Sequence, residues 1–70
     1  MRDLYEALGI TADSTQEAIK RAYRNQARLF HPDVGGSHER MTVINQAYAT
    51  LSNPEARRQF DQRRAFFQDE

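Results

Sequence analysis

The chain has 70 residues, with ten Lys and Arg against ten Asp and Glu, so its formal net charge is zero. This balance argues against a general nucleic-acid coat or a binder of anionic membranes, because both need a field of one sign. Cysteine is absent and hydrophobic residues make up only 39% of the chain, which excludes disulfides, thiolate metal sites and a large core. We expect one domain over residues 1–70, which can also be a piece of a longer protein.

A short helix is predicted close to the N-terminus. Asp3 can cap this helix, and Glu6 follows three residues later, which is the spacing of a capping box. Gly9 is suited to the left-handed conformation that ends many helices. The first helix is therefore expected over about 4–8. No signal-peptide pattern or apolar run long enough to span a membrane is found, so we expect a cytoplasmic protein without a membrane segment.

A longer second helix is predicted over about 15–30. Ser14 and Glu17 repeat the capping-box spacing at its start. The helix should stop at the loop that follows, because Pro32 disfavours helical geometry at His31.

Two further helices complete the chain. Ser37 is a candidate cap for a third helix over about 38–51. Asn53 and Pro54 place a cap and a first-turn proline in the preferred order, which opens a fourth helix over about 54–66. Because no segment alternates with period two, there is no candidate strand and the fold class is all-α.

The two long helices each carry one apolar face. In the second helix this face comprises Ile19, Ala22, Tyr23, Gln26 and Phe30. In the third helix it comprises Met41, Ile44, Ala47, Tyr48 and Leu51. Two such helices joined by a short loop bury these faces most simply against each other, which predicts an antiparallel helical hairpin. We expect Tyr5, Leu8 and Phe60 to cover the ends of its core.

Gln26 interrupts the apolar face of the second helix. An unpaired amide there costs on the order of 1–3 kcal/mol. Either this amide finds a partner, or this part of the hairpin is soft. We predict that Gln26→Leu raises the melting temperature.

The loop at the tip of the hairpin carries the candidate chemistry. Pro32 fixes its own φ and restrains His31, so the imidazole and the Asp33 carboxylate project from a stiffened backbone. A pre-ordered charge loses less entropy when it binds. The helix that leads into the loop concentrates positive charge away from its apolar face. Its basic side chains are Lys20, Arg21, Arg24 and Arg28.

Four blocks of residues stand out along the chain. The first two are Asp3-Leu4-Tyr5-Glu6-Ala7-Leu8-Gly9-Ile10, and Ala22-Tyr23-Arg24 with Ala27-Arg28-Leu29-Phe30-His31-Pro32-Asp33. The other two are Ile44-Asn45-Gln46-Ala47-Tyr48-Ala49-Thr50-Leu51-Ser52-Asn53-Pro54 and Arg58-Gln59-Phe60-Asp61. In this order and spacing the blocks, which cover about residues 2–62, resemble the J-domain of the DnaJ co-chaperone family.

The resemblance implies a monomeric module that docks on a DnaK-type chaperone ATPase. It stimulates ATP hydrolysis by that partner and so couples hydrolysis to client protein folding. The catalysis then belongs to the partner, so the chain is expected not to be an enzyme and to need no catalytic residue, cofactor or metal.

Carried over residue by residue, the resemblance assigns a role to the basic face of the second helix. This face would meet an acidic surface of the ATPase through Lys20, Arg21, Arg24 and Arg28, with Tyr23 beside it. Asp33 would pair with a cation near the interdomain linker of the partner, and His31 and Pro32 would hold the carboxylate in position. Asn45 and Met41 would add contacts beside the loop.

The sequence departs from the family pattern at three places. Asn25 stands where a second basic residue often follows Arg24, which thins the positive face. Gln26 replaces an apolar residue, usually Leu. The loop Val34-Gly35-Gly36 is shorter and less cationic than in many members, although a subset of J-domains shares such a Gly-Gly loop.

Three other readings compete with this one. A nucleic-acid-binding module would use the basic second helix together with Arg57, Arg58, Arg63 and Arg64, but base-stacking aromatics between these charges are missing. A hydrolase triad would need Ser14 or Ser37 beside His31 and Asp33, and no nucleophile elbow is found. A metal site would need His31, Asp33, His38 and Glu39, whose spacing matches no familiar zinc pattern.

The C-terminal aromatic pair has two readings. Phe66 and Phe67 either pack back on the hairpin or form an exposed patch that meets another domain. We favour packing of one of them.

Overall fold

The computed structural model describes residues 3–68. It contains α1 (Leu4–Leu8), α2 (Gln16–Phe30), the short 3-10 helix η1 (Pro32–Val34), α3 (His38–Leu51) and α4 (Pro54–Gln68). No strand occurs in this part of the chain, and the all-α class is confirmed. The helix bounds agree with the expected ones except that α2 starts one residue later and α4 ends two residues later.

The first helix is capped as expected. One carboxylate oxygen of Asp3 accepts hydrogen bonds from the backbone amides of Tyr5 at 3.1 Å and Glu6 at 3.4 Å. Gly9 ends the helix with a φ of 75°. This left-handed conformation is easily adopted by glycine, which explains why so short a helix stops there.

The cap of α2 corrects the sequence prediction. Thr15, and not Ser14, is the N-cap, and its hydroxyl accepts a hydrogen bond from the amide of Ala18 at 3.1 Å. Ser14 belongs instead to the preceding turn, in which its N–H donates to the carbonyl of Thr11 at 3.1 Å. Its own carbonyl accepts a hydrogen bond of 2.6 Å from Arg57, which holds this turn against α4.

The caps of the last two helices are confirmed. The hydroxyl of Ser37 accepts from the amide of Arg40 at 3.2 Å at the start of α3. At the start of α4, the Asn53 side chain accepts from the amides of Glu55 at 3.0 Å and Ala56 at 3.2 Å. These local contacts fix where each helix begins.

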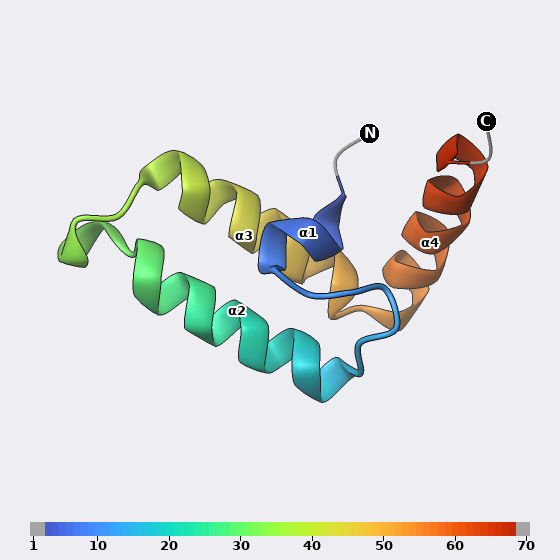
Figure 1. Cartoon of the computed structure of the whole chain (residues 1–70), viewed down its shortest axis with the longest axis horizontal. Helices are drawn as coiled ribbons and strands as arrows, with labels where there is room; N and C mark the ends of the chain where they lie inside the picture. Colours follow the sequence, from blue (N-terminus) through green and yellow to red (C-terminus); the bar gives the residue numbers. More distant parts are fainter. Residues whose placement is uncertain (1–2, 69–70) are drawn as a thin grey trace.

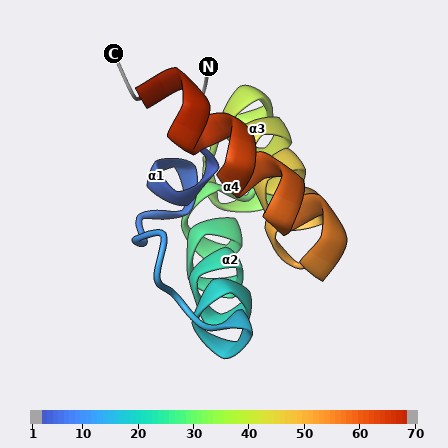
Figure 2. The ribbon, with the colours of Figure 1, turned by 90° about the vertical axis from the view of Figure 1, so that its right-hand side faces the viewer.

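Helices α2 and α3 form the predicted antiparallel hairpin, with η1 at one tip (Figure 1). Helix α1 lies against both of them along the middle of the hairpin. Helix α4 begins at the end opposite η1 and packs on α3, as the view from that end shows (Figure 2). None of the described helices is both long and apolar enough to cross a membrane.

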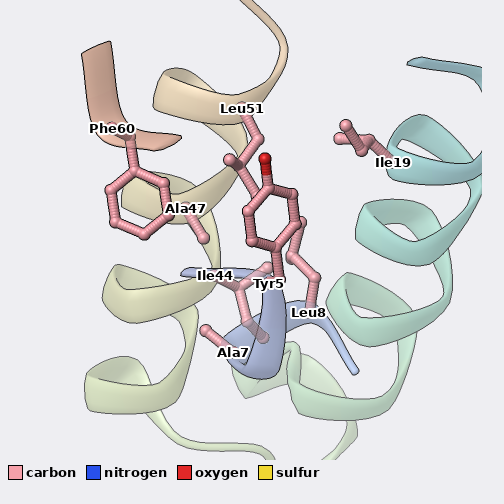
Figure 3. Packing of buried hydrophobic residues seen from close by; sticks show 8 residues of the cluster. All are labelled: Tyr5, Ala7, Leu8, Ile19, Ile44, Ala47, Leu51 and Phe60. Atoms are coloured by element: carbon pink, nitrogen blue, oxygen red, sulfur yellow. The ribbon is translucent and has the colours of Figure 1, made fainter. Parts of the chain in front are cut away.

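The core is small and is centred on α1. Its buried residues are Tyr5, Ala7, Leu8, Ile19, Ile44, Ala47, Leu51 and Phe60. Figure 3 shows Tyr5 and Leu8 between α3 and α2, in the middle of this cluster. The expectation that they cover the ends of the core is therefore wrong, because α1 inserts both side chains into the hairpin, where each is only 1% exposed. Phe60 packs against Tyr5, with ring centroids 5.8 Å apart.

Arginine side chains attach the flanking segments to this core. Arg57 donates to the Tyr5 hydroxyl oxygen at 3.0 Å and to the carbonyl of Ala12 at 3.1 Å. The Tyr5 hydroxyl in turn donates to Asp61 at 2.5 Å. Arg64 pairs with Asp3 at 3.1 Å. Helix α4 is thereby linked to α1 and to the segment that follows it.

Two titratable groups respond to these contacts. Burial by itself would raise the pKa of Asp3, but hydrogen bonds from Arg64, Glu6 and Tyr5, together with the charge of Arg64, hold that pKa below its usual value. Burial and the hydrogen bond to Asp61 raise the pKa of the Tyr5 phenol, against the opposing effect of Arg57. Both shifts favour the protonation states that make the contacts at neutral pH.

Candidate partner-docking site

The tip of the hairpin is a closed, hydrogen-bonded turn. The carbonyl of His31 accepts from the amides of Val34 and Gly36, both at 3.0 Å. The carbonyl of Pro32 accepts from the amide of Gly35 at 3.2 Å. Helix α2 stops before Pro32 as expected, because His31 is extended, with a φ of −63° and a ψ of 135°. The tip is thus held by its own backbone as well as by the proline ring.

The two glycines of the tip are required for different reasons. Gly35 has a φ of 82°, in the region that favours glycine, and ends η1. Gly36 lies so close to the end of α2 that a Cβ atom there would be 2.0 Å from the carbonyl oxygen of Phe30. Any other residue at position 36 would therefore require the backbone of the loop or of the end of α2 to shift.

The imidazole of His31 caps the turn that carries Asp33. Its Nδ1 accepts a hydrogen bond from the amide of Asp33 at 3.1 Å. This contact assigns the ring proton of the neutral imidazole to Nε2. The Asp33 carboxylate lies 3.7 Å from Nδ1, and its side chain is 89% exposed. The geometry thus presents an accessible negative charge on a fixed backbone.

The basic face of α2 is exposed and has no ion-pair partner in the part of the chain that the structure describes. Its members are Lys20, Arg21, Arg24 and Arg28. Among the side chains of residues 3–66, no carboxylate lies within ion-pair distance of any of them. Arg28 lies in the last turn of α2, directly before the tip. In the chain, the basic face is therefore followed directly by the tip that carries the exposed carboxylate of Asp33.

The arginines of α4 differ from those of α2. Arg57 and Arg64 are only 17% and 28% exposed, and both are paired inside the fold. Arg58 pairs with Glu55 at 2.6 Å on the surface of the same helix. This leaves Arg63 as the exposed, unpaired arginine of α4 in the described part of the chain. The basic surface assumed for nucleic-acid binding is therefore much reduced.

Two predicted contact residues are joined to each other across the hairpin. The hydroxyl of Tyr23 on α2 donates to Oδ1 of Asn45 on α3 at 2.8 Å. The Tyr23 ring also stacks on Tyr48, with centroids 4.3 Å apart and an angle of 17° between the planes. The family resemblance placed Tyr23 beside the basic face and Asn45 beside the loop, but it gave no sign of this bond, since the two residues are 22 positions apart in the chain.

The candidate metal site is not assembled among the described residues. Over residues 3–68, no three His, Asp or Glu side chains gather as a metal-binding group. His38 and Glu39 belong to the first turn of α3. The negative charge of Glu39 there interacts favourably with the positive end of the helix dipole. Phe66 is 76% exposed, and the side chain of Phe67 lies outside the described residues.

Sequence reasoning missed the roles of three arginines. Arg57 and Arg64 are seven residues apart and share a helix face with Phe60, a spacing that turns them toward the core. Arg40 donates to the carbonyl of Ala7 at 3.2 Å and covers the ring of Phe30 at 5.2 Å. The signal for Arg40 was its place at the third position of α3, where a capping box would have an acid.

Fold and tip together define a small helical-hairpin module with an exposed, charged end. A family model described as the DnaJ domain matches residues 3–61. The chain belongs to this family of co-chaperone domains, and the resemblance seen in the four sequence blocks is confirmed.

Several known proteins contain a region that is similar to this chain. A tetratricopeptide repeat and J domain-containing co-chaperone of Cryptococcus neoformans is 50% identical over 60 residues, which cover 86% of this chain and 12% of that protein. A chaperone protein DnaJ 1 of Synechocystis sp. is 49% identical over 63 residues, or 86% of this chain and 17% of that protein. For a chaperone protein DnaJ of Trichormus variabilis the identity is 51%, with the same coverage. The chain thus spans less than a fifth of these relatives.

Proposed function

We propose that residues 1–70 form one J-domain, which docks on a DnaK-type chaperone ATPase and stimulates its ATP hydrolysis. The observation that carries this proposal is that an exposed basic face on α2, unpaired among the described residues, is followed directly in the chain by a hydrogen-bonded tip with the exposed Asp33 carboxylate. Membership of the DnaJ domain family supports it. Hydrolysis coupled to client folding is the role that follows for a co-chaperone of this kind.

The basic face gives the approach and the orientation. Charges that complement an acidic surface raise the rate of encounter and fix the register of the complex. They add modest net affinity when they stay near solvent. We therefore expect affinity that falls as salt is added. Tyr23 and Asn45 flank this face, and their mutual hydrogen bond keeps both side chains in place for contact.

The tip supplies the specific contact. Asp33 would meet a cation of the ATPase near its interdomain linker. His31 holds the amide of Asp33, and Pro32 fixes the turn, so little freedom is lost when the carboxylate binds. Stimulation then follows if the domain binds the hydrolysis-prone arrangement of the ATPase more tightly than the other, since this shifts its population.

Single-turnover ATP hydrolysis by a DnaK-type chaperone tests the role of the basic face. The double variant Arg24→Gln/Arg28→Gln is expected to need at least about tenfold more domain for half-maximal stimulation. Arg63→Gln is the matched control, because it removes an exposed arginine from α4. It should behave like the wild type. Equal losses in the two variants, or no loss in either, would contradict docking through α2.

A further inference from the structure

Two exposed apolar side chains stand on either side of Asp33 in the chain. Within the described part of the chain, the exposed large hydrophobic residues are Leu29 at 66%, Val34 at 67% and Phe66 at 76%. Leu29 is in the last turn of α2 and Val34 is the last residue of η1, so the first two bracket Asp33 in the chain. Single exposed apolar residues are common, but two that flank the same exposed carboxylate are a more specific arrangement.

Both side chains are attached to ordered backbone. Leu29 follows Arg28 in α2 and so projects about 100° around the helix from it, at the margin of the basic face. The amide of Val34 is bonded to the carbonyl of His31 at 3.0 Å, and the turn closes at Gly35 directly after it. The neighbouring ring of Phe30 is covered by Arg40, which leaves Leu29 as the accessible apolar side chain of that turn.

Both residues are near Asp33 in the chain. Val34 is the next residue after Asp33, and Leu29 lies four residues before it, on the helix that carries the basic face. Charged contacts near solvent give orientation and rate more than affinity. Apolar surface removed from water at the same interface gives affinity that salt does not screen. The charged surface and the apolar pair are therefore complementary parts of one contact.

We propose that Leu29 and Val34 form an apolar contact with the same ATPase, against an apolar surface beside the cation that receives Asp33. This inference rests on the proposed function and adds a second, salt-independent component to docking. It also accounts for the valine that follows Asp33. A basic residue at that position would strengthen only the charged part of the contact with the ATPase.

The test is the dissociation constant for a DnaK-type ATPase, measured by fluorescence anisotropy from low to high salt. The variant Leu29→Gln/Val34→Thr keeps charge and approximate shape at both positions. We expect binding about tenfold weaker than wild type at every salt concentration, with the same slope of log Kd against log salt. Arg24→Gln/Arg28→Gln should instead reduce that slope.

Phe66→Gln is the matched control, because it removes an exposed apolar side chain from α4, which lies at the other end of the molecule from η1 (Figure 1). It should bind like the wild type. The inference is overturned if Leu29→Gln/Val34→Thr binds within twofold of wild type, or if its loss is matched by Phe66→Gln. In those cases the proposed function stands as long as the wild type stimulates hydrolysis. A wild-type domain that binds the ATPase at no salt concentration overturns both.

Discussion

Gly36 and Phe30 are in direct backbone proximity, since a Cβ atom on Gly36 would lie 2.0 Å from the carbonyl oxygen of Phe30. The tip of the hairpin is thereby folded onto the end of α2. The backbone conformation of the turn that carries Asp33 depends on this close approach, because the amide of Gly36 also closes the turn on His31.

Replacing Gly36 should therefore disturb the tip. Gly36→Ala is expected to lower the free energy of unfolding by about 1–3 kcal/mol, because the backbone must move to admit the methyl group. It should also weaken stimulation of the ATPase. Gly35→Asn is the control, since Gly35 has open space around it and asparagine tolerates its positive φ better than most residues. Urea unfolding of both variants and the hydrolysis assay check this. A Gly36→Ala domain as stable and active as wild type would contradict it.

The pair of Asp3 and Arg64 makes stability depend on acid pH. The folded pKa of Asp3 lies below its usual value of 3.8, so its contribution is present above that pH and is lost as the pH falls through the folded pKa. Asp3→Asn keeps a capping side chain but removes the charge. We expect it to lower stability at pH 7 by about 1 kcal/mol.

Thermal unfolding from pH 7 to pH 2 measures this effect. The difference in stability between wild type and Asp3→Asn should be constant above about pH 5 and should shrink below about pH 4. Arg64→Gln should reproduce most of the loss at neutral pH. A difference that persists unchanged to pH 2 would show that the charge of Asp3 is not what stabilises the fold.

Tyr5 anchors α4 to the core through its hydroxyl. Tyr5→Phe keeps the buried ring but leaves Arg57 and Asp61 without the hydroxyl that joins them. We expect a loss of about 1–3 kcal/mol, which for a domain of this size lowers the melting temperature by at least about 4 °C. Calorimetry provides the measurement, and an unchanged melting temperature would refute the anchoring role.

The raised pKa of Tyr5 predicts an alkaline effect as well. Folding favours the protonated phenol, so the contribution of Tyr5 is intact below its usual value of 10.0 and is lost as the pH rises toward the folded pKa. The wild type should lose stability in this range, and Tyr5→Phe should lose less.

Gln26 places a polar side chain on the apolar face of α2. Its side chain is half-buried and lies against Gly9. A Cβ atom added to Gly9 would be 3.4 Å from Nε2 of Gln26. Among the described residues its amide has no hydrogen-bond partner. Gln26→Leu should therefore stabilise the domain by about 0.5–1 kcal/mol and raise the melting temperature by several degrees. A lower melting temperature, measured by circular dichroism, would contradict this.

Much of the fold is predictable because its signals are local. Asp3, Gly9, Ser37 and Asn53 act within one helical turn, so their sequence neighbours suffice to place the helix ends. The start of α2 was misassigned because Ser14 and Thr15 are both good caps. The choice between them involves the contact of the Ser14 carbonyl with Arg57, which comes from a distant helix.

The central place of α1 and the roles of the arginines could not be predicted in the same way. Tyr5 and Leu8 lie in the middle of the core because of how α1 packs across the hairpin, and helical periodicity does not specify packing between elements. Arg57 and Arg64 are indistinguishable from surface charges in the sequence, because their partners Tyr5 and Asp3 are more than 50 residues away along the chain. At the tip, the stiffness was predictable from Pro32, while the close approach of Gly36 to α2 depends on the path of the loop in three dimensions, which residue types alone do not specify.

The direct test of the account is single-turnover ATP hydrolysis by a DnaK-type chaperone with wild-type domain and with Asp33→Asn. Asparagine is nearly isosteric with aspartate, and the backbone N–H of residue 33 can still donate to Nδ1 of His31. Both domains should therefore have the same circular dichroism spectrum, and their melting temperatures should agree within about 2 °C. We predict clear stimulation by the wild type and almost none by Asp33→Asn. Equal stimulation by the two domains would contradict the assignment of the exposed carboxylate as the contact that triggers hydrolysis.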